Sequence, residues 1–227
     1  MCGRYTFIAP PGLVEDRFDA TFAEPVAPTY NAAPSQHLPV ITNTAPGQIQ
    51  LLQWGLVPAW VKDRTSGPQP INARAETLSE KPSFRQLLQR RRCLVLADSF
   101  YEWQQKEAHG LPPKTPHRIL LKSTAPYAFA GLWDEWIDRA TGEVLPTFTI
   151  VTTEPNALMA PLHHRMPVIL ESRAAERAWL DDGLSVQEHQ QLLHPYPAEL
   201  MQEYVISKMV NSPAHNEPAV LEPVQAA

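Results

Sequence analysis

The chain has 227 residues and a formal net charge of −5 at pH 7, with 44% hydrophobic and 19% charged residues. This composition indicates one globular domain over residues 1–227, and it argues against a general nucleic-acid-coating protein, since such domains are usually basic. No apolar run approaches the ~18 residues needed to cross a bilayer, and no secretory leader is recognisable, so we expect a cytoplasmic protein without membrane contacts.

The chain contains two cysteines, too few for a disulfide framework. Cys93 lies in the apolar run Cys93–Ala97, where we expect a buried strand. Removal of Met1 would make Cys2 the first residue, with a free α-amine beside its thiol. Such an amine can condense with an aldehyde, and the thiol can then close a thiazolidine ring. The alternative is that Cys2 is simply a small buried hydrophobe.

The first half of the chain predicts a short helix over Leu13–Phe22 and a β-hairpin. The hairpin strands are Leu38–Thr42 and Ile49–Trp54, joined at the turn-forming pair Pro46-Gly47. Trp60 follows on a Gly- and Pro-containing bend. An aromatic ring there can stack on bases, although tryptophan more often anchors a core.

Asn72, Arg74 and Glu76 alternate along the next segment, which on extended chain would place the three side chains on one face. Such a row fits a polar ligand and a solvated edge strand equally well. A helix capped by Ser83 is then predicted, ending in a solvated basic run, Arg90–Arg92.

Glu102 directly follows the apolar strand and lies between two aromatic residues, Tyr101 and Trp103. A carboxyl group held against aromatic rings tends to have a raised pKa, which suits proton transfer near neutral pH. The alternative is an outward-facing glutamate on an alternating strand.

The second half of the chain predicts further strands, which exclude an all-helical fold, and short helices between them. The adjacent pair His163-His164 is a weak metal motif without a spaced partner, so we expect proton chemistry there and no metal or cofactor. The strands are His117–Lys122, Tyr127–Trp133, Thr147–Thr153 and Val168–Leu170, and the helices are Asn156–Leu162, Ser172–Leu180 and Ser185–His194.

The ordered motifs of the chain resemble the SRAP family, named after a presumed SOS response-associated peptidase. The likeness extends from residue 2 to about residue 211, and the order of the motifs makes it specific. The motifs are Met1-Cys2-Gly3-Arg4, Tyr30-Asn31-Ala32-Ala33-Pro34, Trp54-Gly55-Leu56-Val57-Pro58, Asn72-Ala73-Arg74-Ala75-Glu76-Thr77, Asp98-Ser99-Phe100-Tyr101-Glu102-Trp103 and His163-His164-Arg165-Met166-Pro167.

The resemblance implies a single α+β domain, in which mixed β-sheets form a partly open barrel with peripheral helices. It implies a protein that senses abasic sites in single-stranded DNA, and so lies at the nucleoid when bound. Nothing in the sequence suggests an obligate dimer, so we expect a monomer. The implied lyase-type activity attaches the amino-terminal cysteine to the aldehyde of the lesion, first as a Schiff base and then as a thiazolidine. The family name further implies an autopeptidase activity.

Four residues match catalytic positions of the family. Cys2 matches the nucleophile, Asn72 the amide that orients the sugar and the amino terminus, and Glu102 the glutamate that moves protons during imine formation. His163 matches the histidine that assists opening of the sugar ring, since the family pattern is His, one variable residue, then Arg-Met-Pro.

Four further residues match DNA-contacting positions. Arg4 and Arg74 match arginines that hold phosphates on either side of the lesion, and Arg165 matches a further DNA contact. Trp60 falls where a family tryptophan packs against displaced bases, and Val61 follows it where family members carry a second tryptophan.

Two other functions fit the same residues. In an amino-terminal-cysteine peptidase or amidohydrolase, the Cys2 thiol would attack an amide with the α-amine as base. In a noncovalent single-stranded DNA-binding module, Cys2 would be dispensable. The net charge of −5 counts against the latter, because it predicts a weak grip on undamaged DNA.

Overall fold

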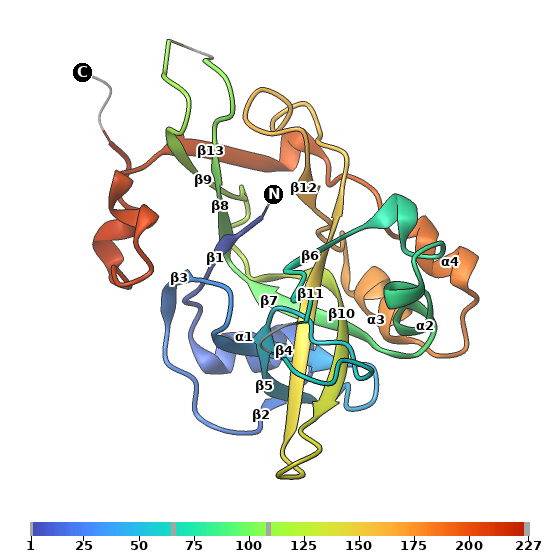
Figure 1. Ribbon diagram of the computed structural model, residues 1–227. Helices are drawn as coiled ribbons and strands as arrows, with labels where there is room; N and C mark the ends of the chain where they lie inside the picture. The colour runs from blue at the N-terminus through green and yellow to red at the C-terminus, as the bar shows by residue number, and fades with distance from the viewer. Residues whose placement is uncertain (1, 65–66, 108–109, 225–227) are drawn as a thin grey trace.

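Two twisted β-sheets form the centre of the protein, with the helices at the periphery (Figure 1). The structure is a computed structural model that describes residues 2–64, 67–107 and 110–224. The first sheet joins five described strands in the order β13-β9-β8-β1-β3. Their bounds are β1 Arg4–Phe7, β3 Thr29–Ala32, β8 Ser99–Trp103, β9 Pro116–Leu121 and β13 Met201–Val205.

The second sheet curls into a barrel. Along the described chain its order is β12-β11-β10-β7-β4-β5-β2, with β6 paired to β11. A short parallel pairing of β5 with β11, Gln53 to Thr147 and Trp54 to Phe148, closes the ring. The bounds are β2 Thr21–Phe22, β4 His37–Thr42, β5 Gln48–Trp54, β6 Asn72–Arg74, β7 Arg92–Ala97, β10 Tyr127–Ile137, β11 Val144–Thr153 and β12 Met166–Pro167.

This architecture confirms the α+β fold expected from the resemblance. The barrel strands are rich in β-branched and aromatic residues, which pack well on a pleated surface. The first sheet stays open, with β3 and β13 as its edges. The predicted hairpin of residues 38–54 is confirmed as antiparallel β4 and β5, with Leu38 opposite Leu52.

Aromatic side chains fill the space between the sheets. Tyr5 of β1 packs against Trp54 of β5, with ring centroids 5.3 Å apart, and against Phe129 of β10 at 5.9 Å. Trp54 in turn stacks on Phe148. These contacts fix β1 against the barrel wall, which determines where the residues preceding β1 lie.

The helices begin and end where local chemistry requires. Ser172 caps α3, Arg173–Leu180, and Ser185 forms a capping box with Glu188 at α4, Val186–Gln191. The helices predicted at residues 172–180 and 185–194 are therefore confirmed, although α4 is shorter than predicted. The other helices are α1 Pro11–Phe18 and α2 Pro82–Arg90, with short 3-10 turns η1 Ala75–Thr77, η2 Ala198–Leu200, η3 Lys208–Asn211 and η4 Pro218–Leu221.

Several local predictions are wrong. The helix predicted at residues 156–162 is a series of turns. Helix α1 ends four residues early, because Asp19 takes a left-handed conformation with φ 54°. Helix α2 is not capped by Ser83: it begins at Pro82, whose fixed φ suits the first turn. The row over residues 72–77 is also broken, since η1 follows β6 at Ala75.

Arg92 was expected on a solvated face and is fully buried. Its guanidinium donates to the carbonyl oxygens of Leu88 and Trp179 and forms an ion pair with Asp182. These partners satisfy the buried cation, which otherwise would be costly. None of the helices within the described ranges is long and apolar enough to cross a membrane.

Candidate active site

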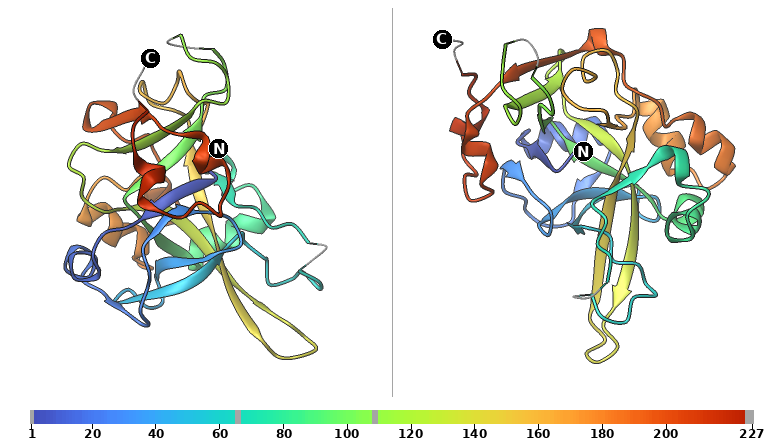
Figure 2. Two further views of the ribbon diagram at one scale, coloured as in Figure 1. Left: turned by 90° about the vertical axis from the view of Figure 1, so that its left-hand side faces the viewer. Right: turned by 45° about the horizontal axis from the view of Figure 1, so that its top comes forward.

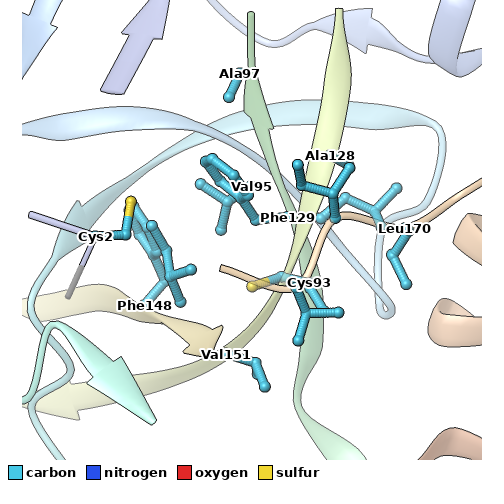
Figure 3. Close-up of a cluster of buried hydrophobic side chains, with 14 of the residues drawn as sticks. Cys2, Cys93, Val95, Ala97, Ala128, Phe129, Phe148, Val151 and Leu170 are labelled. Carbon is cyan, nitrogen blue, oxygen red and sulfur yellow. The ribbon is translucent and has the colours of Figure 1, made fainter. Parts of the chain in front are cut away.

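Cys2 lies immediately before β1, with 0% of its surface exposed. Strand β1 runs between β3 and β8, and its amino-terminal end lies between the two sheets (Figures 1 and 2). Figure 3 shows the Cys2 side chain in the same buried cluster as Cys93 and Phe148. Burial raises the pKa of the Cys2 thiol far above its ordinary value, and the neighbouring Glu102 adds to this shift. The thiol is therefore protonated at neutral pH.

Asn72 contacts the amino-terminal segment directly. Its side-chain Nδ2 donates a 2.9 Å hydrogen bond to the backbone oxygen of Cys2. Parallel pairing with β11, which aligns Asn72 with Ile150, brings β6 to this position across 70 residues of sequence. The other amide atom, Asn72 Oδ1, is buried and has no hydrogen-bond partner among the described residues, so it remains available to a ligand.

Glu102 and His163 face each other in the same buried region. His163 Nε2 lies 4.0 Å from Glu102 Oε1, and the two residues are 5% and 3% exposed. Desolvation raises the pKa of the Glu102 carboxyl above its ordinary value, as predicted for this glutamate. The same cause lowers the pKa of His163 to about 4. Both groups are thereby favoured in their uncharged forms.

The tautomer of His163 follows from its backbone contact. The backbone N–H of Arg165 donates to His163 Nδ1 at 2.9 Å, and the Arg165 backbone oxygen lies 3.2 Å from the same nitrogen. The shorter contact favours the neutral tautomer with its proton on Nε2. This nitrogen is the one that lies 4.0 Å from Glu102 Oε1, beyond hydrogen-bond distance. The site thus combines a protonated thiol, a carboxyl with raised pKa, a neutral imidazole and an amide, which suits addition to a carbonyl with proton transfer.

Arg4 is held by the carboxyl-terminal segment. Its Nη1 donates to Asn31 Oδ1 at 3.0 Å and to the backbone oxygen of Val210 at 2.8 Å. Asn31, fully buried in β3, donates in turn to the backbone oxygens of Val210, Ser212 and His215. Figure 2 shows this segment lying across β1 and β3. Asn31 belongs to one of the sequence motifs, but the sequence alone does not reveal this contact with the carboxyl-terminal segment.

The two other arginines of the predicted DNA surface differ in environment. Arg74 is exposed at the end of β6. Arg165 is mostly buried and makes two hydrogen bonds to Glu76, of 2.7 and 2.9 Å, and a third to the backbone oxygen of Thr152. Arg165 therefore connects the segment carrying His163 to η1, and its charge is already paired.

Trp60 is 62% exposed, whereas Trp54 belongs to the core. Val61, next in the chain, packs into a small apolar cluster with Val57, Trp136 and Leu145. Trp136 Nε1 also donates to the Val61 backbone oxygen at 2.7 Å. The packing of Val61 thus anchors the loop next to Trp60, whose indole faces outward.

The structure therefore brings together Cys2, Asn72, Glu102 and His163. Sequence reasoning gave no role to His117, which lies directly opposite Glu102 in the pairing of β8 with β9. Only the register of two predicted strands could have revealed it. Cys93 is buried in the core, as predicted. Within the described part of the chain, no group of three or more His, Cys, Asp or Glu side chains could hold a metal ion.

Comparison with known proteins identifies the family of this chain. The family model described as SOS response associated peptidase (SRAP) matches residues 1–213. The chain belongs to the SRAP family. A relative from Bacillus subtilis, named abasic site processing protein YoqW, is 45% identical over 98% of this chain and 99% of its own length.

More distant SRAP relatives include abasic site processing protein HMCES of Pongo abelii, 33% identical over 87% of this chain and 65% of its own length. A crystal structure of a protein from Bacteroides thetaiotaomicron superimposes with a TM-score of 0.87 at 30% identity, covering 98% of this chain and all of that one. One from Bordetella bronchiseptica, at 24% identity and a TM-score of 0.78, shows the same fold.

Proposed function

We propose that this SRAP protein recognises abasic sites in single-stranded DNA and attaches itself to them covalently through Cys2. The observation that carries the proposal is the convergence of Cys2, Asn72, Glu102 and His163 between the two sheets. The names of the SRAP relatives, abasic site processing proteins, support the same lesion as substrate. The protein would act as a monomer in the cytoplasm, at the nucleoid when bound.

The reaction begins once Met1, which lies outside the described residues, has been removed. His163 and Glu102 open the deoxyribose ring to its aldehyde by moving the hydroxyl proton. The Cys2 amine then adds to the aldehyde carbon, and Glu102 protonates the departing hydroxyl, so that water leaves and an imine forms. Finally the Cys2 sulfur bonds to the imine carbon, and its proton passes to the nitrogen, which closes the thiazolidine.

The raised pKa of Cys2 favours this order of events. A thiol that stays protonated is a poor first nucleophile, since the thiolate is the reactive form. An amine that attacks first needs no thiolate, and the thiol then adds to an already activated imine. The same property disfavours the amidohydrolase alternative, in which the thiol must attack an unactivated amide.

Incubation with a single-stranded oligonucleotide carrying one abasic site tests the proposal. On a denaturing gel the wild-type protein should show a heat-stable adduct. Cys2→Ala should show no heat-stable adduct, and neither protein should form one with an undamaged strand. Cys2→Ser keeps the amine and should give a linkage that survives only after borohydride reduction. A protein with exposed Cys2 that leaves the damaged strand unmodified would refute the proposal.

A further inference from the structure

A row of titratable side chains crosses the inner face of the first sheet behind the proposed catalytic residues. Glu102 of β8 and His117 of β9 are directly opposite each other in the antiparallel register. Directly opposed residues project to the same face, with Cβ atoms about 4.5–5.5 Å apart. His117 is therefore a close neighbour of Glu102, on the side of Glu102 that leads toward β13.

The next strand continues the row. His117 Nδ1 lies 2.6 Å from Glu203 Oε2, and the Glu203 side chain is 32% exposed while His117 is buried. His117 Nε2, on the other edge of the ring, is buried and has no hydrogen-bond partner among the described residues. One ring nitrogen is thus bonded to a carboxylate that reaches solvent, and the other has a free position for a proton.

This arrangement answers a difficulty in the proposed reaction. Glu102 must gain and lose protons, yet its carboxyl is buried, and a bound DNA strand would cover it further. A path to solvent would let this buried acid regain or release its proton between successive transfers with the substrate. The row runs from the covered side toward β13, an edge strand of the sheet.

We propose that His117 and Glu203 form a proton relay that connects Glu102 with solvent while DNA occupies the site. A proton leaving Glu102 binds His117 Nε2, and the Nδ1 proton passes to Glu203, which releases it to water. The reverse sequence reloads Glu102 and restores the starting tautomer, so no proton is created or lost. Both relay residues act through Glu102 and do not touch the DNA; the inference rests on the proposed function.

The charged surroundings of His117 are compatible with a relay. The titratable groups on its own face are Glu102 and Glu203, with His163 and Cys2 beyond Glu102. Arg118, next in β9, projects to the opposite face, where it contacts Tyr204 and Ser99.

The test is the rate of adduct formation on an abasic oligonucleotide across pH, with four variants. Glu203→Gln can still accept a hydrogen bond from His117 but takes up no proton, and His117→Gln removes the relay group. Glu203→Ala exposes His117 to small solutes. Glu199→Gln is the matched control, because it removes one carboxylate from η2 at the same edge of the molecule.

We expect Glu203→Gln and His117→Gln to slow the adduct about tenfold and to alter the pH profile, with Glu199→Gln unchanged. Formate should raise the rate of adduct formation by Glu203→Ala several-fold above the rate in chloride at equal ionic strength. It should not raise the rate of Glu203→Gln. Melting curves identify a variant that has merely unfolded. If His117→Gln is unfolded, the two Glu203 variants alone decide whether the relay exists. Wild-type rates in all relay variants, or slow variants without rescue and with an unchanged pH profile, overturn the relay alone. No adduct from the wild type would overturn the proposed function itself.

Discussion

Glu102 and His163 are shifted in opposite directions by the same cause. Desolvation raises the pKa of the acid and lowers that of the base to about 4, so burial shifts each group toward its uncharged form. A neutral pair can exchange a proton with a sugar hydroxyl without first separating charge in a buried site. Paired groups with shifted pKa values are typical of acid–base catalysis.

Replacement of Glu102 by glutamine should slow adduct formation by roughly 10²–10⁴-fold, because the amide neither donates nor accepts the transferred proton. Binding of the oligonucleotide should change little. In the wild type the rate should titrate above the ordinary glutamate pKa of 4.5, because burial raises the Glu102 pKa. Single-turnover rates across pH check this, and an unaltered rate in Glu102→Gln would remove this residue from the mechanism.

His163 should titrate near pH 4, since burial lowers its pKa to about that value. The ring is then neutral over the range of about pH 5–8 in which an ordinary histidine changes charge. Ring carbon and nitrogen shifts in NMR, assigned with His163→Gln, measure both the pKa and the tautomer. A midpoint at or above 6.5, or a proton on Nδ1, would contradict the geometry.

At the scale of elements, the carboxyl-terminal segment holds β1 in place through Asn31 and Arg4. Replacing Asn31 by alanine leaves buried carbonyl oxygens unpaired, and we expect the free energy of unfolding to fall by about 2–3 kcal/mol. Amide hydrogen exchange should quicken in residues 207–216 and in β1 before other regions. Exchange that rises uniformly over the molecule would show that the segment has no such local role.

The two arginines near β6 should behave differently toward DNA. Arg74 is exposed, so Arg74→Gln should reduce the slope of log affinity against log salt by about one. Arg165 is paired with Glu76, so Arg165→Gln should leave the slope nearly unchanged and instead lower stability and adduct rate. Fluorescence anisotropy over a salt series makes the comparison, and equal slopes in both variants would contradict it.

On the scale of the whole molecule, the net charge of −5 argues for weak binding to undamaged strands. Retention on DNA would then depend on the covalent bond. The bound fraction should therefore fall steeply with salt for an intact strand, whereas an adduct, once formed, should survive molar salt. Filter binding before and after a salt wash distinguishes the two, and salt-resistant binding by Cys2→Ala would contradict this view.

Sequence patterns predicted most of the strands, because runs such as residues 93–97 and 147–153 combine apolar and β-branched residues. The ordered motifs also gave the four residues that converge at the site. Arg92 escaped prediction because the partners that satisfy its buried guanidinium include the Trp179 backbone oxygen and Asp182, which are 87 and 90 residues away in the sequence. His117 escaped because a lone histidine acquires meaning only through the register that aligns it with Glu102.

The central claim is that both the amine and the thiol of Cys2 end up on one carbon of the lesion. Intact mass spectrometry of the adduct with an abasic oligonucleotide tests it most directly. We predict protein lacking Met1 plus the oligonucleotide minus one water, unchanged by borohydride and with the Cys2 thiol no longer alkylated by iodoacetamide. An adduct that borohydride reduces and that still carries a free Cys2 thiol would contradict the thiazolidine, and no adduct at all would contradict the whole account.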